Sequence, residues 1–206
     1  HLHLGWQPSL LPDAAALAAQ TDVAVVWVNQ AAGEGMDRDS FALPGDQNDL
    51  IEAVCAANPN TVVVLNTSGA VLMPWIDRVA AVLQVWYPGE VVGTAPAAVL
   101  FGAAEPGGRL PLTFPATEDQ AIPAYIGGGT VDLAEGVFAG YRHFVSHGHR
   151  PLFAFGHGLS YTTFEYSDLH IEPLSAPDAV SIRVTVRNTG ARPGSEVVQV
   201  YIGKLP

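Results

Sequence analysis

The sequence has little cysteine, few basic residues and no long apolar run, and each shortage excludes a class of protein. A single cysteine, Cys55, occurs among the 206 residues, so no disulfide can form within the chain and the fold must rest on packing. Its position beside Ile51 and Val54 in a helical apolar pattern predicts a buried, inert thiol. No apolar run approaches the roughly 18 residues that a membrane-spanning helix needs.

The chain is also poor in basic charge. Nine basic residues stand against twenty acidic ones, so the formal net charge is −11. Nucleic acids and anionic membranes repel such a chain, and we expect neither as a partner. The first residues lack the charged and apolar segments of a signal peptide, and no methionine starts the chain. We therefore expect a piece of a longer protein, whose compartment, secreted or cytoplasmic, stays open because any signal would lie upstream of His1.

Apolar residues make up 49% of the chain, and over residues 10–115 they alternate between strand-like and helix-like patterns. Strands are predicted at 22–29, 61–65 and 81–86, helices at 11–20, 44–58 and 91–101, a short helix from 74, and an edge strand at 108–115. The nearly continuous apolar strands are typical of a sheet buried on both faces. This alternation predicts an α/β fold, a mostly parallel sheet flanked by helices in an α/β sandwich.

The pattern changes after residue 115. Residues 116–161 hold no sustained period and predict an ordered connecting segment packed on the sandwich. Alternating residues at 181–187 and 196–201, with a turn at 188–190 between them, predict the first part of an antiparallel β-sandwich. The expected domains are a lead-in at 1–9, the α/β sandwich at 10–115, the connecting segment at 116–161 and the partial β-sandwich at 162–206.

One carboxylate, Glu34, stands between two glycines just after the first predicted strand. An open α/β sheet places its chemistry at the carboxyl ends of its strands, and glycines let a loop turn tightly there. Glu34 is therefore the candidate catalytic residue, and a solvated surface loop is the alternative. The pair Gly33-x-Gly35 is not a dinucleotide fingerprint, because Arg38 stands where the third glycine is needed.

An ordered series of motifs runs along the chain. It comprises Glu34-Gly-Met-Asp-Arg38, Leu43-Pro44, Met73-Pro-Trp75, Trp86-Tyr-Pro-Gly-Glu90, Pro106-Gly-Gly-Arg-Leu-Pro111, Gly140-Tyr-Arg142 and Pro151-Leu-Phe-Ala-Phe-Gly-His-Gly-Leu-Ser-Tyr-Thr-Thr-Phe164. The series resembles the second, α/β-sandwich domain of the family 3 glycoside hydrolases of the β-glucosidase type, running into their fibronectin-III-like domain. The resemblance covers about residues 10–206. The lead-in Leu4-Gly-Trp6 resembles the exit of an inserted sugar-binding module of the PA14 type.

The resemblance implies a retaining β-glucosidase that hydrolyses terminal non-reducing β-D-glucosyl residues without a cofactor or metal. It implies that Glu34 is the general acid/base and that the nucleophile is an Asp on an N-terminal (β/α)8-type barrel, absent from this chain. This chain alone is then expected to be inactive. Asp37 is not the nucleophile, because two carboxylates three residues apart do not bracket a sugar ring. We expect it to pair with Arg38 and shape the loop.

Other residues keep two interpretations. Glu90 either approaches the cleft or caps the helix after it, which we favour. Trp86 and Tyr87 either stack on a sugar or pack in the core. The spacing of His143, His147 and His149 permits a metal site, but no cysteine or carboxylate accompanies it, and we expect a solvated loop. For the whole chain, the alternatives are a non-catalytic scaffold or a carbohydrate-binding module. The Glu34 motif argues against an N-acetylglucosaminidase of the same family.

Overall fold

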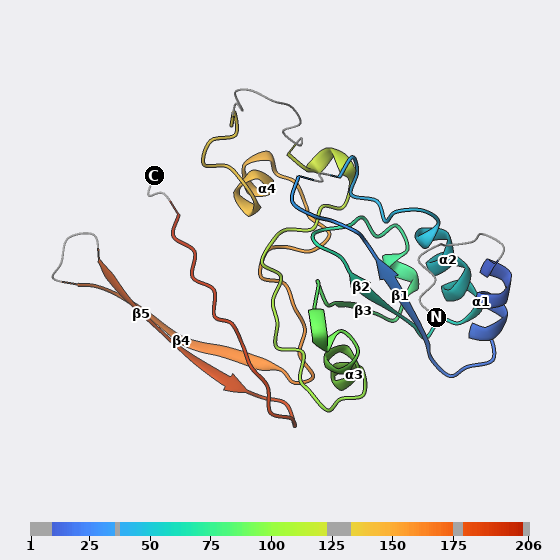
Figure 1. Cartoon of the computed structure of the whole chain (residues 1–206). Helices are drawn as coiled ribbons and strands as arrows, with labels where there is room; N and C mark the ends of the chain where they lie inside the picture. The colour runs from blue at the N-terminus through green and yellow to red at the C-terminus, as the bar shows by residue number, and fades with distance from the viewer. Residues whose placement is uncertain (1–9, 36–37, 123–132, 175–178, 204–206) are drawn as a thin grey trace. The chain divides into compact units, whose positions relative to one another are not determined.

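The computed structural model describes residues 10–35, 38–122, 133–174 and 179–203 (Figure 1). The chain divides into two compact units. Unit 1 holds the described residues up to Pro96 together with Pro111–Phe155, and unit 2 holds Ala97–Leu110 and the described residues from Gly156 onward. The lead-in at 1–9 and Asp37 lie outside the described residues. The domain boundaries expected from the sequence stay predictions.

A three-stranded parallel sheet forms the centre of unit 1. Its strands β1 (Ala24–Asn29), β2 (Thr61–Asn66) and β3 (Ala81–Gln84) lie in the order β1-β2-β3. Val63 of β2 is fully buried between its register partners Val26 of β1 and Val82 of β3. Valine suits the interior of such a sheet because its branched side chain packs well on a pleated surface. The predicted strands of the parallel sheet are confirmed.

Helices α1 (Leu11–Ala18) and α2 (Gln47–Ala57) pack against each other beside this sheet, and α2 contacts β1 and β2 (Figure 1). The apolar face of α2 buries Ile51, Val54 and Cys55, which confirms the buried position expected for the cysteine. The short helix predicted from residue 74 is the 3₁₀ turn η2 (Ile76–Arg78). No helix among the described residues is long and apolar enough to cross a membrane.

The helix predicted at 91–101 is shorter than expected. The chain forms the 3₁₀ turn η3 (Gly89–Val91) and then α3 (Thr94–Leu100), and the boundary between the two units falls inside α3. Between 116 and 161 the structure adds the 3₁₀ turn η4 (Glu118–Gln120) and the helix α4 (Tyr141–His147), which the weak sequence pattern did not predict.

Two predicted strands are wrong. At 108–115 only an isolated antiparallel bridge forms, between Phe114 and Phe153, because Pro111 and Pro115 have no N–H to donate to a ladder. At 196–201 no strand is assigned although the sequence alternates. A strand needs a neighbour to receive its hydrogen bonds, and the described part of the chain supplies none there.

Unit 2 contains the antiparallel pair β4 (Phe164–Pro173) and β5 (Val180–Asn188), with an irregularity between Ser167 and His170. Ile171 and Ile182 face each other in register, and both remain exposed. Two strands are too few to cover an apolar face. The fold class, an α/β domain followed by a partial antiparallel β-sandwich, is confirmed, and its fibronectin-III-like character stays a prediction.

Candidate active-site loop

The loop that carries Glu34 leaves the carboxyl end of β1, next to the carboxyl end of β2. Side-chain amides join the two ends, because Asn66 Nδ2 donates to Asn29 Oδ1 at 2.8 Å. The first turn of α2 is fixed at the same place, since Asn29 N–H donates to Gln47 Oε1 at 2.7 Å and Gln47 Nε2 donates to Asn29 O at 2.9 Å. The edge of the sheet from which the loop emerges is therefore well ordered.

Glu34 itself lies in a turn and is exposed. Gly35, the residue after it, has φ +73°, a backbone conformation that residues with a Cβ atom rarely adopt. The expectation that a glycine is needed for this tight turn is confirmed at Gly35. Glu34 is therefore accessible at the surface of unit 1.

Arg38 lies at the far end of the loop and is half-buried. Its Nη1 donates to Gln30 Oε1 at 3.2 Å and to Ala70 O at 2.8 Å, and its guanidinium lies 5.1 Å from the centre of the Phe41 ring. Burial lowers the pKa of Arg38, and the charges of Tyr87 and Glu118 act in the opposite direction. The sequence suggested an Asp37–Arg38 pair, but Asp37 lies outside the described residues.

The segment after Arg38 is also fixed. The Glu118 carboxylate accepts from Phe41 N–H at 3.0 Å and from Ser40 Oγ at 3.2 Å. Phe41 O in turn accepts from Leu72 N–H at 2.9 Å. Sequence reasoning missed Glu118, because it is 77 residues from Phe41 and no local signal connects them.

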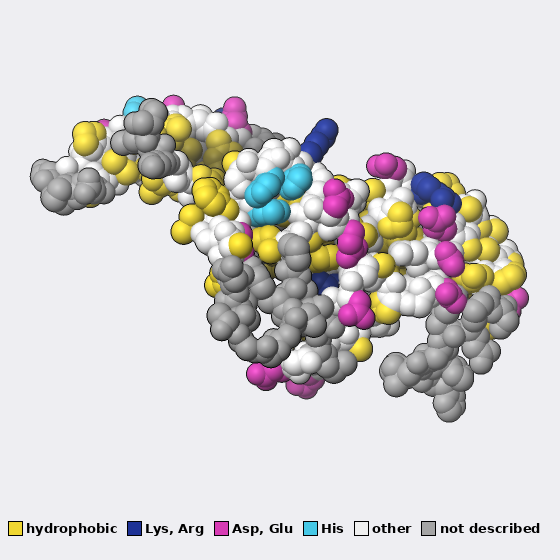
Figure 2. Space-filling model, turned by 90° about the horizontal axis from the view of Figure 1, so that it is seen from above, with side chains coloured by type: hydrophobic (Ala, Val, Ile, Leu, Met, Phe, Trp, Pro, Cys, Tyr) yellow, Lys and Arg dark blue, Asp and Glu magenta, His cyan; other side chains and the backbone are white. Residues whose placement is uncertain are grey.

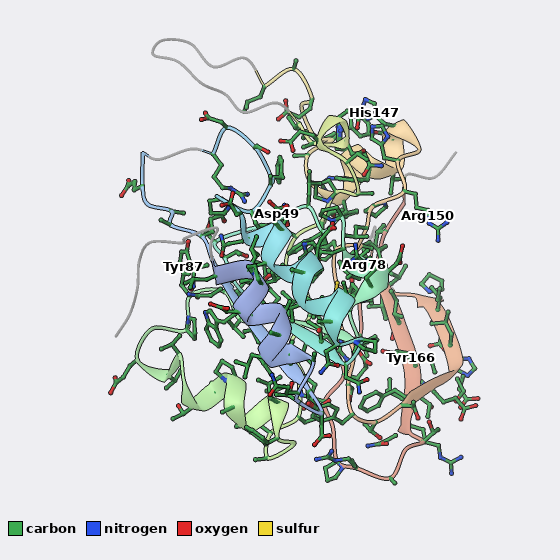
Figure 3. All side chains as sticks on the ribbon, turned by 90° about the vertical axis from the view of Figure 1, so that its right-hand side faces the viewer. Asp49, Arg78, Tyr87, His147, Arg150 and Tyr166 are labelled. Atoms are coloured by element: carbon green, nitrogen blue, oxygen red, sulfur yellow. The ribbon has the colours of Figure 1, made fainter. Side chains whose placement is uncertain are left out.

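The aromatic pair after β3 has separate roles. Trp86 packs edge-on against Phe114, with ring centres 6.4 Å apart, and has φ 56°, a strained backbone conformation for a large side chain. This contact favours core packing for Trp86. Tyr87 is 47% exposed and donates its hydroxyl proton to Gln30 O, so it reaches the base of the Glu34 loop (Figure 3). Glu90 is exposed in the first turn of η3.

The three histidines form a surface cluster on α4 and just beyond it, not on the solvated loop that the sequence predicted. The ring of His143 lies 4.3 Å from that of His147 and 5.7 Å from that of His149. Figure 2 shows the cyan patch on one face of the molecule. Among the described residues no group of three His, Cys, Asp or Glu side chains is placed to hold a metal ion.

A cavity of about 430 Å³ lies beside α4 in unit 1. Phe41, Tyr141, Phe144 and Phe155 supply aromatic walls, and the Tyr141 and Phe155 rings are 5.5 Å apart. Sequence reasoning did not identify the cavity. No local pattern could find it, because its walls come from distant segments.

The parallel sheet, its flanking helices and the Glu34 loop at the carboxyl edge define unit 1 as an α/β domain with an exposed loop carboxylate. A separate antiparallel pair follows it in the chain. The family model described as the glycosyl hydrolase family 3 C-terminal domain matches residues 8–161. The chain belongs to this family, which confirms the resemblance found in the sequence.

Relatives and solved structures agree with the family. A β-glucosidase of Rhizobium radiobacter is 44% identical over 203 residues, which cover 93% of this chain and 25% of that protein. A β-glucosidase from Streptomyces venezuelae, solved in complex with D-glucose, is 42% identical with a TM-score of 0.80, over 89% of this chain and 24% of that one. A β-glucosidase from Kluyveromyces marxianus in complex with glucose is 38% identical with a TM-score of 0.80, over 89% and 22%. The chain spans about a quarter of the length of the curated relatives it matches.

Proposed function

We propose that this chain is the acid/base-bearing part of a retaining β-glucosidase that hydrolyses terminal non-reducing β-D-glucosyl residues. Glu34 is the general acid/base, and the nucleophile is an Asp on an N-terminal (β/α)8-type barrel outside this chain. The observation that carries the proposal is the position of Glu34, exposed on a turn at the carboxyl edge of the parallel sheet. The family and the β-glucosidase names of the relatives support the reaction class.

The exposure of Glu34 is what a two-domain site requires. In a retaining glycosidase the two carboxyl groups lie about 5 to 5.5 Å apart on opposite sides of the scissile bond. A partner carboxylate at that separation must have room to approach, and a buried Glu34 would deny it. Glu34 then protonates the departing glycosidic oxygen while the Asp attacks the anomeric carbon. In the second step Glu34 takes a proton from the water that attacks the anomeric carbon, and the Asp carboxylate leaves.

The leaving group tests this role. In the protein that contains the barrel, Glu34→Gln is expected to lower kcat/KM on alkyl glucosides by about 10²- to 10⁴-fold, the usual contribution of a general acid. On 2,4-dinitrophenyl glucoside, whose aglycone leaves without a proton, formation of the glycosyl-enzyme should change little. Added azide should restore turnover of Glu34→Ala on that substrate and yield glucosyl azide. The matched control is Glu52→Gln, a partly exposed carboxylate on α2 that pairs with Arg78.

If Glu34→Gln lowered kcat/KM equally on both substrates and azide did not restore turnover, Glu34 would not be the general acid/base. Such a result would favour the scaffold or carbohydrate-binding alternative.

A further inference from the structure

The Glu34 loop is closed at its base by a contact between its two flanking residues. Seven residues, 31–37, separate Gln30 from Arg38, and Glu34 is the middle one. Arg38 Nη1 donates to Gln30 Oε1 at 3.2 Å, so the side chains that flank the loop meet each other. A loop whose ends are joined has fewer ways to displace its tip than one held only by its backbone.

Gln30 is itself held firmly to the sheet. It is only 7% exposed, and its N–H donates to Asn66 O at 3.1 Å, at the end of β2. Its Oε1 also accepts from Ser68 Oγ at 3.3 Å, and its carbonyl accepts from the Tyr87 hydroxyl. Gln30 therefore connects the base of the loop to the ends of β2 and β3.

Arg38 makes its second anchor to the segment that follows β2. The same Nη1 donates to Ala70 O at 2.8 Å, across 32 residues of sequence. Gly69 leaves room for this contact, because a Cβ there would lie 3.2 Å from Arg38 Nη2. The Phe41 ring 5.1 Å away covers the guanidinium. The half-buried cation is thus held by two acceptors and one aromatic face.

We propose that Arg38 is the positioning residue of the acid/base loop: by closing the loop on Gln30 and Ala70, it fixes where the Glu34 carboxylate meets the glycosidic oxygen. This inference rests on the proposed function of Glu34. Proton transfer depends steeply on placement, and a displacement of about 1 Å can cost about 10²-fold in rate.

The test is made in the full protein with its barrel, on an alkyl glucoside and on 2,4-dinitrophenyl glucoside. Arg38→Gln should lower kcat/KM on the alkyl glucoside at least about 10-fold and on the activated glucoside less than about 3-fold, because only the first needs the proton. Arg38→Lys, which keeps the cation and one donor group, should recover part of the loss. Gln30→Ala should give the same substrate pattern, and the double variant should lose little more than the worse single one, because both remove the same contact.

Arg78→Gln is the matched control. Arg78 also makes one bond to a side chain, Nη1 to Glu52 Oε2 at 3.0 Å, and one to a carbonyl, Nη2 to Glu52 O at 3.2 Å. Arg78 lies beside α2 (Figure 3), and its replacement should leave kcat/KM on both substrates unchanged. All rates are measured well below the thermal midpoint of each variant, so that the protein stays folded. Any remaining loss of folded protein would lower the rate on both substrates alike.

Two failures are distinguishable. In the first, Glu34→Gln lowers kcat/KM mainly on the alkyl glucoside, while Arg38→Gln lowers kcat/KM equally on both substrates or on neither. The positioning role is then refuted and the proposed function stands. In the second, Glu34→Gln itself lowers kcat/KM equally on both substrates. The proposed function is then refuted, and the positioning role with it.

Discussion

Asn58 joins the end of α1 to the start of β2, and its replacement tests whether the hydrogen bonds of its side chain stabilise unit 1. Its side chain is buried and makes three strong hydrogen bonds. Nδ2 donates to Ala18 O at 3.0 Å and to Thr21 O at 2.8 Å, and Oδ1 accepts from Asn60 N–H at 2.9 Å. Asn58→Ala removes all three.

The magnitude follows from what each partner loses. A net hydrogen bond contributes about 1 kcal/mol, and a buried group left without a partner costs about 1 to 3 kcal/mol. Ala18 O keeps two other donors, Thr21 N–H at 3.2 Å and Thr21 Oγ1 at 3.0 Å, so its loss is small. The main losses are at Thr21 O and Asn60 N–H. We expect Asn58→Ala to lower the free energy of unfolding of unit 1 by about 2 to 3 kcal/mol.

Urea unfolding followed by tryptophan fluorescence measures this effect. All four tryptophans precede residue 97, so their fluorescence reports on unit 1. With a slope of about 2 kcal/mol per molar urea, the midpoint should fall by about 1 to 1.5 M. Asn60→Ala is the control, because it removes one exposed bond to Asp22 O at 3.2 Å and should cost less than about 0.5 kcal/mol. Equal midpoints for the two variants would refute the reasoning.

Two further predictions concern unit 2. Gly158→Ala should lower the stability of unit 2 by about 1 to 3 kcal/mol, measured as a lower thermal midpoint, because the new Cβ would lie 2.6 Å from Gly108 O. Gly203→Ala, in the same unit and with open space around it, should be near neutral. Burial, and then the charge of Arg109, lower the pKa of His157. The unfolded state therefore binds the proton first, so stability is full above the ordinary pKa of about 6.5 and is lost as pH falls through it toward the folded value. Melting curves from pH 8 to 5 should show this fall, and His157→Gln should flatten it; an unchanged slope would contradict the assignment.

Local signals were sufficient for the parallel sheet and failed where pairing depends on other parts of the chain. The valine-rich runs at 22–29 and 61–65 predict buried strands, and the structure has β1 at Ala24–Asn29 and β2 at Thr61–Asn66. The run at 196–201 alternates just as clearly, yet it forms no strand, because alternation describes a side-chain pattern and a strand also needs a hydrogen-bonding neighbour. At 108–115 the prolines outweighed the apolar pattern.

The sequence by itself determined the α/β class, the family and the position of Glu34 after the first strand, because each depends on residues close together in the chain. Only the tertiary structure decided how the residues that follow the loop are held. Ala70 meets Arg38 across 32 residues, and Glu118 meets Phe41 across 77. Such contacts exist only once the parallel strands bring their carboxyl ends to one edge of the sheet. A short motif therefore supplies the proposed acid/base residue, whereas the contacts of the residues around it depend on the packing of the whole unit.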